Sequence, residues 1–382
     1  MTILLLVLGL LTQAQAGPRP LPFSDKGWDL RGDGTAIGHV DGREALDVRT
    51  GFGFRRDVRL EDGTIEFDVK LTDARSFVYL YFRAESDGER EEVYLRPHKS
   101  TLPDALQYAP VWQDNSAWQL YHGPGGTAAT RFEAGVWTHV KLVVQGRSAA
   151  FFVNDMNRPA MVVPRMAREP RAGYIALGGF LPANVAIDGP IARFSNVVIH
   201  PGHVPFDFAA ALAASDAAKP VPVDSGVIRE WAVSQAFAPA DTAGTPALPQ
   251  ASTLGTFQTV TADAGGLVPL DRHVRLADGQ SVSAAVARVT VRATEAGVRA
   301  FDLGFSDVAT VFLNGAPVFR GDGRYSFDRP RREGLIGFDN ARLYLPLRAG
   351  DNDLAIVVTD TFGGWGLMGR FVDAQGIEVR AR

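Results

Sequence analysis

The sequence predicts an all-β protein made of two antiparallel β-sandwich or jelly-roll domains in tandem. Forty glycines, 23 prolines and frequent Asp-Gly or Asn-Gly pairs separate many short apolar runs, a pattern typical of strands joined by tight turns. Long segments with apolar residues at helical spacing are almost absent. With 382 residues and 46% hydrophobic content, the chain is long enough to bury two cores.

Residues 1–16 are expected to be a signal peptide. An apolar run, residues 3–11, precedes Ala14-Gln15-Ala16, an A-x-A cleavage pattern, although no Lys or Arg precedes the run. A short membrane anchor is the weaker alternative, because the run has about half of the roughly 20 residues that span a bilayer. We therefore expect a periplasmic or secreted protein with no integral membrane segment after signal removal. The absence of cysteine excludes disulfides, thiol chemistry and a lipid-modified cysteine.

Residues 17–200 are predicted to form the first sandwich. Its clearest strand is GTIEFDVKL, residues 63–71, in which every second residue is apolar and the residues between are charged. Further strands are expected at residues 140–144, 149–153, 174–177 and 191–199.

Residues 201–226 are rich in Ala and Pro and are predicted to be a linker, with one or two helical turns around residues 208–214. The second sandwich is expected at residues 227–382. Its predicted elements are strands at 287–293 and 299–305, a hairpin VFLNGAPVF that turns at Asn314-Gly315, and a strand pair within LYLPLRAGDNDLAIVVTD. In FGGWG, residues 362–366, Trp365 is expected to pack over the sandwich edge, with stacking on a sugar as the alternative.

A hairpin is predicted where SFVYLYFRAE, residues 76–85, and REEVYLR, residues 90–96, flank Asp87-Gly88. A two-residue turn there would pair residues whose numbers sum to 175. One face would then pair Phe82 with Val93 and Leu80 with Leu95. The other face would pair Arg83 with Glu92, Tyr81 with Tyr94, and Tyr79 with Arg96.

The second of these faces has the composition of a sugar-binding surface. Sugars combine apolar C–H patches with a rim of hydroxyls, so they suit flat aromatic rings mixed with Arg and Glu. The candidate ligand-binding residues on the hairpin are Tyr79, Tyr81, Arg83, Tyr94 and Arg96. The alternative is an ordinary solvated face, on which Arg83–Glu92 is an ion pair and Tyr79–Arg96 a cation–π contact.

The segment after His98 is expected to be a long loop that walls one end of this face, because it contains Pro103, Pro110 and many polar residues. Tyr108, Trp112 and Trp118 are its candidate stacking platforms. For each of these three, packing of the loop against the core is an equally good interpretation. His98 continues the face of Tyr94 and Arg96, and hydrogen bonding at the strand end is its simpler role.

Composition and motifs exclude several functions. The net charge of −4 comes without a Lys/Arg block, so nucleic acid is not an expected partner. No nucleophile-elbow, metalloprotease, phosphate-loop or EF-hand spacing appears, and seven scattered histidines do not indicate a metal site, so no cofactor is expected, with structural calcium left open. Glu66-Phe67-Asp68 is similar to the start of the E-x-D-x-x-E signature of laminarinase-type glycosidases, but no second glutamate follows.

Residues from about 20 to 200 resemble the concanavalin A-like lectin/glucanase superfamily, and within it the 3-keto-disaccharide hydrolase-like family. The resemblance depends on strand patterns: GTIEFDVKL, FVYLYFR, YLRPH, LQYAPVW, VWTHVKLVVQGRSAAFFVND, AGYIALGGF and ARFSNVVIH. It implies a two-sheet jelly roll that binds carbohydrate on a concave face. Residues from about 227 to 382 resemble a galactose-binding-like jelly roll in VFLNGAPVF, LRAGDNDLAIVVTD and FGGWG.

Three functions follow as hypotheses. The first is an exported carbohydrate-binding protein that holds a glycan on the concave face of the first sandwich. The second is a glycoside hydrolase or related glycan-processing enzyme that uses the same cleft, with Glu92 as the candidate acid or base and His98 as its partner; it needs a second carboxylate from a distant strand. The third is a non-catalytic protein-interaction module.

Overall fold

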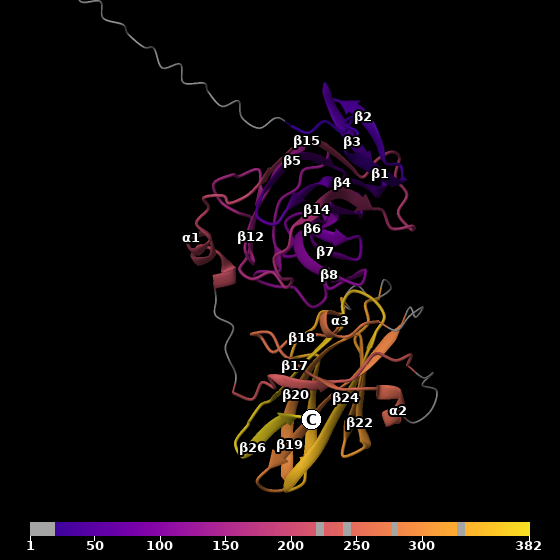
Figure 1. Cartoon of the computed structure of the whole chain (residues 1–382), viewed down its shortest axis with the longest axis vertical. Helices are drawn as coiled ribbons and strands as arrows, with labels where there is room; N and C mark the ends of the chain where they lie inside the picture. The colour runs from indigo at the N-terminus through magenta and orange to yellow at the C-terminus, as the bar shows by residue number, and fades with distance from the viewer. Residues whose placement is uncertain (1–19, 219–224, 240–245, 277–281, 327–332) are drawn as a thin grey trace, which may run out of the picture.

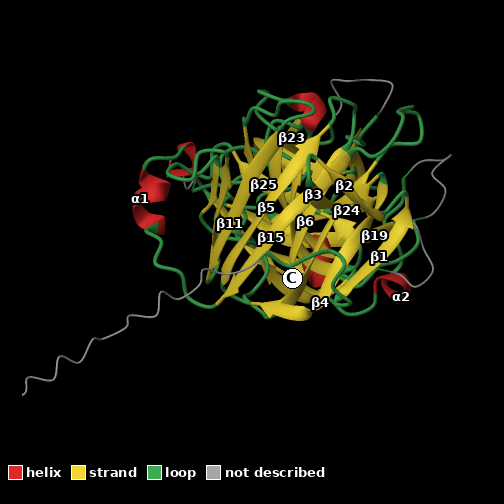
Figure 2. Cartoon of the chain, turned by 90° about the horizontal axis from the view of Figure 1, so that it is seen from above, coloured by secondary structure: helices red, strands yellow, loops and turns green. Residues whose placement is uncertain are grey.

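The computed structural model describes residues 20–218, 225–239, 246–276, 282–326 and 333–382. The expected signal peptide, residues 1–16, lies outside these ranges. The strands form four sheets with antiparallel pairing, packed in pairs as two sandwiches (Figure 1). Helices are few, and α1 (Phe208–Ala213) and α2 (Ala251–Leu254) lie at the margins of the strands (Figure 2). The prediction of an all-β protein built from antiparallel sandwiches is therefore confirmed.

The first sandwich consists of two sheets that we name after a central strand of each. The β6 sheet contains, in spatial order, β1 (Trp28–Asp33), β4 (Thr50–Leu60), β14 (Gly173–Phe180), β6 (Phe77–Ser86), β7 (Glu89–Leu95), β8 (Leu106–Trp112) and β10 (Thr127–Ala128), with β9 (Asn115–Ser116) paired to β8. The β5 sheet contains β13 (Met161–Val163), β12 (Ser148–Val153), β11 (Trp137–Gln145), β5 (Gly63–Leu71), β15 (Ala192–Pro201), β3 (Arg43–Val48) and β2 (Ala36–Val40).

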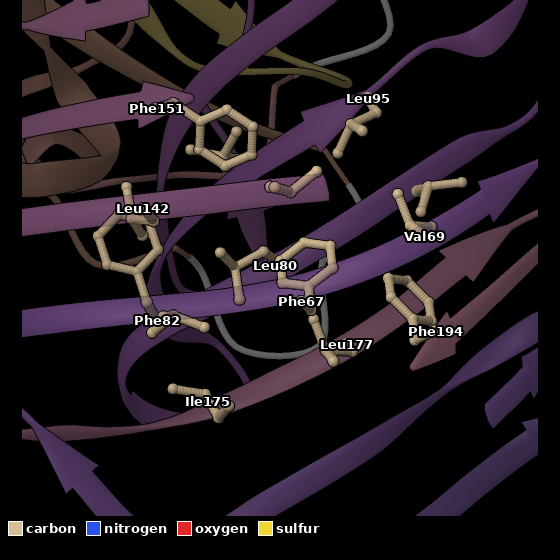
Figure 3. Packing of buried hydrophobic residues seen from close by; sticks show 14 of the residues in the cluster. Phe67, Val69, Leu80, Phe82, Leu95, Leu142, Phe151, Ile175, Leu177 and Phe194 are labelled. Atoms are coloured by element: carbon tan, nitrogen blue, oxygen red, sulfur yellow. The ribbon is translucent and has the colours of Figure 1, made fainter. Parts of the chain in front are cut away.

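The core of this sandwich lies between the two sheets. In β5, Ile65, Phe67, Val69 and Leu71 are at most 2% exposed, as their alternation predicts. Figure 3 shows Phe67 and Val69 packed with Leu80 and Phe82 of the opposite sheet, together with rings such as Phe151 and Phe194. Each such side chain contributes about 2 kcal/mol through its burial, so this core is the main source of stability of the first sandwich.

The hairpin of β6 and β7 has its turn where it was predicted, but the predicted register is wrong beyond the turn. Ser86 pairs with Glu89 as expected, whereas Leu80 pairs with Val93, Tyr81 with Glu92, and Tyr79 with Tyr94. The cause is a bulge around Arg83, which has a φ of +50°. The register shift is two residues, so the separation of inward and outward side chains is preserved.

A glycine on the neighbouring strand β14 makes room for this bulge. A Cβ at Gly173 would lie 2.2 Å from the carbonyl carbon of Arg83. The pairing of β14 with β6 shifts at the same place, between Tyr174 and Ala176. The bulge is therefore a feature of two strands that are far apart in the sequence.

The predicted long loop after His98 is wrong in part, because residues 106–112 form strand β8. A short 3-10 helix, η1 (Pro97–Lys99), precedes it. Pro110 is tolerated inside the strand because its missing N–H falls on the side of β10. The N–H of Tyr108, two residues earlier, points to that side. Strand β10 pairs there only with Leu106 and Gln107, so it needs no hydrogen bond from residue 110.

The segment after the first sandwich contains α1 (Phe208–Ala213) and η2 (Asp216–Ala218), so the predicted helical turns are confirmed. The second sandwich has a β24 sheet with β17 (Gln258–Thr261), β16 (Glu230–Val233), β19 (Ser283–Ala293), β24 (Gly350–Asp360), β21 (Val308–Leu313) and β22 (Ala316–Asp322), and β26 (Ile377–Ala381) paired to β19. Its β20 sheet contains β18 (Val268–Pro269), β25 (Gly366–Phe371), β20 (Gly297–Ser306) and β23 (Ala341–Leu347). The short helices α2 (Ala251–Leu254) and α3 (Leu270–His273) lie between strands.

Of the local predictions for the second sandwich, the hairpin turn agrees with the structure, whereas Trp365 lies in the core and not over the sandwich edge. The β21–β22 hairpin turns at Asn314-Gly315, where both residues have positive φ. Trp365 is fully buried in the core between the two sheets, and its Nε1 donates a hydrogen bond to the carbonyl oxygen of Val358. Trp365 therefore packs against protein, and sugar stacking by this residue is ruled out.

The two sandwiches are in direct contact through residues 113–122, which follow β8 (Figure 1). The Gln113 amide donates to the carbonyl oxygens of Asp271 and Val274 and accepts from the Leu276 N–H. The Gln119 N–H donates to the carbonyl oxygen of Gly363 at 2.9 Å. This segment therefore belongs to the junction between the sandwiches.

Candidate functional site

The outer surface of the β6 sheet carries a strip of aromatic rings, which we name the tyrosine face. It consists of Phe52 and Phe54 from β4, Tyr174 from β14, Phe77, Tyr79 and Tyr81 from β6, and Tyr94 from β7. Phe52 and Tyr81 are stacked with ring centroids 4.6 Å apart, and the Tyr79 and Tyr94 centroids are 5.3 Å apart. Because each pair adds about 1 kcal/mol beyond its buried area, the rings form one cohesive strip across four strands.

The strip is continuous because β14, which lies between β4 and β6, has a glycine, Gly178, where the strip passes over it. Gly178 pairs with Phe52 on one side and with Tyr79 on the other. A Cβ at Gly178 would lie 2.0 Å from Cδ1 of Phe52, so the Phe52 ring occupies the space above this glycine. Sequence analysis missed Phe52 and Phe54, although the alternation GFGF at residues 51–54 was a signal for them.

The three tyrosines of the hairpin differ in how their hydroxyls are used. The Tyr94 hydroxyl donates to Oε1 of Gln107 and accepts from Arg96, both at 2.9 Å. The Tyr81 hydroxyl accepts from Arg90 at 3.3 Å. Within the described residues the Tyr79 hydroxyl makes no hydrogen bond to protein, and this side chain is only partly buried. Tyr79 is therefore the phenol on this face that is available to a ligand.

Burial, reinforced by the negative charge of Glu92, holds the pKa of Tyr79 well above its ordinary value. The pKa values of Tyr81 and Tyr94 are raised as well, mainly by burial. All three phenols are therefore protonated near neutral pH, and Tyr79 can both donate and accept a hydrogen bond.

Glu92 lies on the tyrosine face, where it is 1% exposed and bound on both oxygens. Its Oε1 accepts from Ser116 Oγ at 2.6 Å, and its Oε2 is 3.0 Å from Nη2 of Arg90. Burial raises the pKa of Glu92, while Arg90 and Ser116 oppose that shift. Arg90 also lies 3.7 Å from Asp114, so one guanidinium connects Glu92 with a second, exposed carboxylate.

His98 and Glu92, which sequence analysis had paired, are not joined by any hydrogen bond or ion pair in the described part of the chain. The His98 Nδ1 accepts from the Ser76 N–H at 3.4 Å, and its ring lies 5.5 Å from that of Phe77. Burial and the neighbouring cations, Lys99 first, lower the pKa of His98 to about 4. His98 is therefore neutral near pH 7 and hydrogen-bonded at the strand end.

Four of the candidate binding residues are not on the tyrosine face, and Arg83 and Tyr108 are the first two. The bulge turns Arg83 away, so its guanidinium donates to the carbonyl oxygens of Glu61 and Gly146 and pairs with Asp62. Tyr108 faces the core, where it is 1% exposed and its hydroxyl donates to Oε2 of Glu91 at 2.7 Å. The predictions for Arg83 and Tyr108 are therefore wrong: the bulge reorients Arg83, and the pairing of β8 with β7 points Tyr108 inward.

Trp112, the last residue of β8, and Trp118, which follows this strand, belong to the junction. Trp112 is 7% exposed and packs in a cluster with Leu120 and with Ile336 of the second sandwich, so its ring is not available for stacking. Trp118 is partly buried, and its ring contacts Tyr325 and Phe362 of the second sandwich. Arg96 links Trp118 to the tyrosine face, because its guanidinium lies 4.8 Å from the Tyr94 ring and 5.8 Å from the Trp118 ring.

Glu91, the neighbour of Glu92 on β7, points to the opposite side and was not identified from the sequence as a special residue. It is 1% exposed, and its Oε1 has no hydrogen-bond partner within the described residues. Burial raises the pKa of Glu91 to about 7, against the opposing effect of the Tyr108 hydroxyl and nearby arginines. A buried acid with this pKa titrates in the neutral range, which makes it a marker for pH-dependent stability.

Neither a metal cluster nor a membrane-crossing helix is found in the described ranges. No group of three or more His, Asp or Glu side chains there is placed to hold a metal ion. None of the helices described has the length and apolar character needed to cross a bilayer. A cavity of about 480 Å³ in the second sandwich is lined by Gln235, Gln258 and His273, among others, but both glutamine amides already donate within the protein, to Thr256 and to the His273 carbonyl.

Comparisons with known proteins give similarities of shape at low identity. No protein-family model matches the chain, and no curated protein matches it. Among solved structures, it is similar to the carbohydrate binding module CBM66 from Bacillus subtilis, with 15% identity, a TM-score of 0.34, and coverage of 46% of this chain and 95% of that one. It is also similar to a β-glucanase from Bacillus licheniformis, with 13% identity, a TM-score of 0.36, and coverage of 50% and 100%.

A third similar structure is a Bacillus subtilis protein of unknown function with a galectin-like fold, with 11% identity, a TM-score of 0.34, and coverage of 46% and 89%. Scores and identities this low assign neither a family nor an activity to this chain. The resemblance to the 3-keto-disaccharide hydrolase-like family therefore stays a prediction from the sequence.

Proposed function

We propose that this chain is an exported, periplasmic or secreted carbohydrate-binding protein that holds a glycan against the tyrosine face. The observation that carries the proposal is Tyr79. It lies in the middle of the aromatic strip, its ring is partly exposed, and its protonated hydroxyl is unused by the protein. A sugar ring can stack on such a phenol while one of its hydroxyls bonds the phenol oxygen.

The surroundings of Tyr79 support a polar ligand that carries both donors and acceptors. Arg90 and Glu92 lie on one side of it and Arg96 on the other, each fixed by bonds to protein. Fixed charges and stacked rings lose little conformational entropy when a ligand binds, which favours a preorganised site. The sequence resemblance to a disaccharide-hydrolase family is consistent with a short glycan as the minimal ligand.

Binding is tested by glycan-array screening followed by calorimetry on single variants of the full chain. Tyr79→Ala should weaken glycan binding about 10-fold, because it removes a stacking ring and a hydrogen bond together. Tyr79→Phe should retain the stacking part of that affinity. The matched control is Trp137→Ala on β11, since Trp137 is a partly exposed ring on the outer surface of the opposite sheet. Equal affinities for wild type and Tyr79→Ala would contradict the proposal.

A glycan-processing enzyme using the same face is the second candidate, and the burial of Glu92 favours it. A buried carboxyl with a raised pKa is the usual form of a general acid. If the chain is such an enzyme, Glu92→Gln should abolish turnover and preserve most of the glycan affinity. If wild type turns over no bound glycan, this candidate is excluded and binding remains. A stable protein partner without sugar affinity would instead identify an interaction module.

A further inference from the structure

Three aromatic rings from the two sandwiches meet at the junction next to the tyrosine face. Trp118 follows β8, whereas Tyr325 and Phe362 belong to the second sandwich. The Trp118 centroid lies 5.7 Å from that of Tyr325 and 6.2 Å from that of Phe362, and the Tyr325 and Phe362 centroids are 6.1 Å apart. We name these three residues the junction rings.

The junction rings are accessible as well as mutually packed. Phe362 is 57% exposed, and Trp118 and Tyr325 are partly buried. This contrasts with Trp112 at the end of β8, which is 7% exposed in a cluster of residues from both sandwiches. Because Phe362 contacts two further rings, its exposure adds to a continuous aromatic surface and is not that of an isolated side chain.

The exposed ring is held on a rigid backbone. The buried carboxylate of Asp307 accepts hydrogen bonds from the N–H groups of Thr361 and Phe362, both at 2.8 Å. The next two residues, Gly363 and Gly364, have φ values of +89° and +119° and lie against Trp118 and Ala117. A Cβ at Gly363 would be 2.6 Å from Nε1 of Trp118, so glycine is required for this close approach. Phe362 is thus fixed in position although its side chain is exposed.

The junction rings are continuous with the tyrosine face through two side chains. Gln107 accepts from the Tyr94 hydroxyl and donates to the carbonyl oxygen of Trp118 at 2.7 Å. Arg96 contacts the rings of both Tyr94 and Trp118. The Tyr325 hydroxyl also accepts a hydrogen bond at 3.0 Å from Arg75 of the first sandwich. Rings and polar groups therefore alternate from Tyr79 across to Phe362.

We infer that the junction rings are an additional glycan subsite, shared by both sandwiches, which extends the site on the tyrosine face and selects oligosaccharides long enough to reach both. The inference depends on the proposed carbohydrate-binding function. Its occupant is a neutral oligosaccharide, because the exposed surface combines ring faces with hydrogen-bonding groups and two of the cations beside it, Arg96 and Lys99, already bind carboxylates. Arg96 pairs with Asp104, and Lys99 pairs with Asp104 and with Glu333.

The test measures affinity against chain length with the full protein, using cello- and laminari-oligosaccharides from disaccharide to hexasaccharide as probes. Phe362→Ala should weaken hexasaccharide binding about 10-fold and leave disaccharide binding unchanged, whereas Tyr79→Ala should weaken both. The matched control is Tyr344→Ala, since Tyr344 is a 68% exposed ring on β23 of the same sandwich. Phe362 is largely exposed, so its variant should keep the wild-type melting temperature.

The outcomes separate this inference from the function on which it depends. If Tyr79→Ala weakens binding and Phe362→Ala leaves the affinity for every oligosaccharide length unchanged, the junction subsite is wrong and the proposed function stands. If wild type binds neither series and no member of a glycan array, the proposed function is wrong and the subsite fails with it. A longer-chain preference that Phe362→Ala removes and Tyr344→Ala preserves would establish the shared site.

Discussion

The first sandwich has two outer faces that differ in kind although they enclose the same core. The tyrosine face of the β6 sheet consists of seven contacting rings with a few buried charges. The outer face of the β5 sheet carries ion pairs: Arg43–Asp68, Lys70–Asp41, Lys141–Glu66 and Arg193–Asp47. The ion-paired face demonstrates what solubility and folding require of an outer surface in this domain. The number of contacting rings on the other face exceeds that requirement, which is the reason that we propose a ligand for it.

The same contrast explains why Glu66-Phe67-Asp68 is not a catalytic motif. Glu66 and Asp68 lie on the ion-paired face, where Lys141, Arg43 and His139 bind their oxygens. Carboxylates neutralised in this way on an open sheet surface stabilise the sheet modestly. The ring beside them, Trp137, is contacted by the cations Arg43 and Lys70, whereas Glu92 lies within a strip of seven rings.

Among the changes that should distinguish the two faces, removal of the Tyr94 side chain should have the largest effect on the free energy of unfolding. Tyr94→Ala should lower the free energy of unfolding by about 4 kcal/mol, because it empties a ring site that is nearly closed and leaves Arg96 and Gln107 without a shared partner. Tyr94 is 3% exposed although it lies on an outer face. Tyr94→Phe, which removes only the hydroxyl, should cost about 1 kcal/mol. Urea unfolding measures both, and a loss below about 1 kcal/mol for Tyr94→Ala would mean that the strip is not packed.

The second-largest effect is the pH dependence of stability that Glu91, buried behind the tyrosine face, should cause. The pKa of Glu91 is raised to about 7 in the folded protein, so the folded state holds a proton that the unfolded state releases above its ordinary pKa. The free energy of unfolding should therefore fall as pH rises from about 4.5 to 7, by at most about 3 kcal/mol. Glu91→Gln should remove this contribution and make the protein more stable than wild type at pH 8, whereas the buried carboxyl of Asp360, whose pKa burial also raises to about 7, keeps part of the slope.

A second variant checks the cause of this pH dependence. The Tyr108 hydroxyl donates to Glu91 and opposes the rise of its pKa. Tyr108→Phe should therefore steepen the loss of stability with pH, whereas Glu91→Gln should reduce it. Melting temperatures measured from pH 4 to 8 give both slopes, and parallel curves for the wild type and Glu91→Gln would refute the assignment.

These residues also indicate how far sequence reasoning reached. The alternation in β5, the Asp87-Gly88 turn and the Asn314-Gly315 turn are local signals, and all three were predicted correctly. The outward direction of Tyr79, Tyr81 and Tyr94 followed from the same alternation, because the bulge shifts the register by an even number of residues.

The predictions that were wrong concern residues whose positions depend on contacts with residues far away in the sequence. Nothing around Arg83 marks a bulge, since the space for it comes from Gly173 on another strand. The inward direction of Tyr108 follows from the pairing of β8 with β7, which Pro110 concealed. Trp112 and Trp118 contact residues of the second sandwich, so no local pattern could distinguish a stacking platform from a junction.

The third-largest effect is expected for Asp68, which has three side-chain hydrogen-bond partners on the ion-paired face. Asp68 accepts from Arg43 at 2.8 Å, from His139 at 2.7 Å and from Asn196 at 2.6 Å. Asp68→Asn should cost about 1 kcal/mol of unfolding free energy, because one oxygen still accepts while the charge is lost. The cost should shrink in 1 M salt, since screening weakens exposed pairs. An effect as large as that of Tyr94→Ala would eliminate the contrast between the two faces.

The smallest effect is expected for an isolated pair on the same ion-paired face. Arg193 lies 3.3 Å from Asp47, and their side chains are 32% and 30% exposed. Water and salt screen such a pair, so Arg193→Gln should change the free energy of unfolding by less than about 0.5 kcal/mol. The double variant with Asp47→Asn should show a coupling energy within about 0.5 kcal/mol of zero in a double-mutant cycle. A coupling above about 1 kcal/mol would mean that the ion pairs act as one network, and the β5 face would then be as cooperative as the tyrosine face.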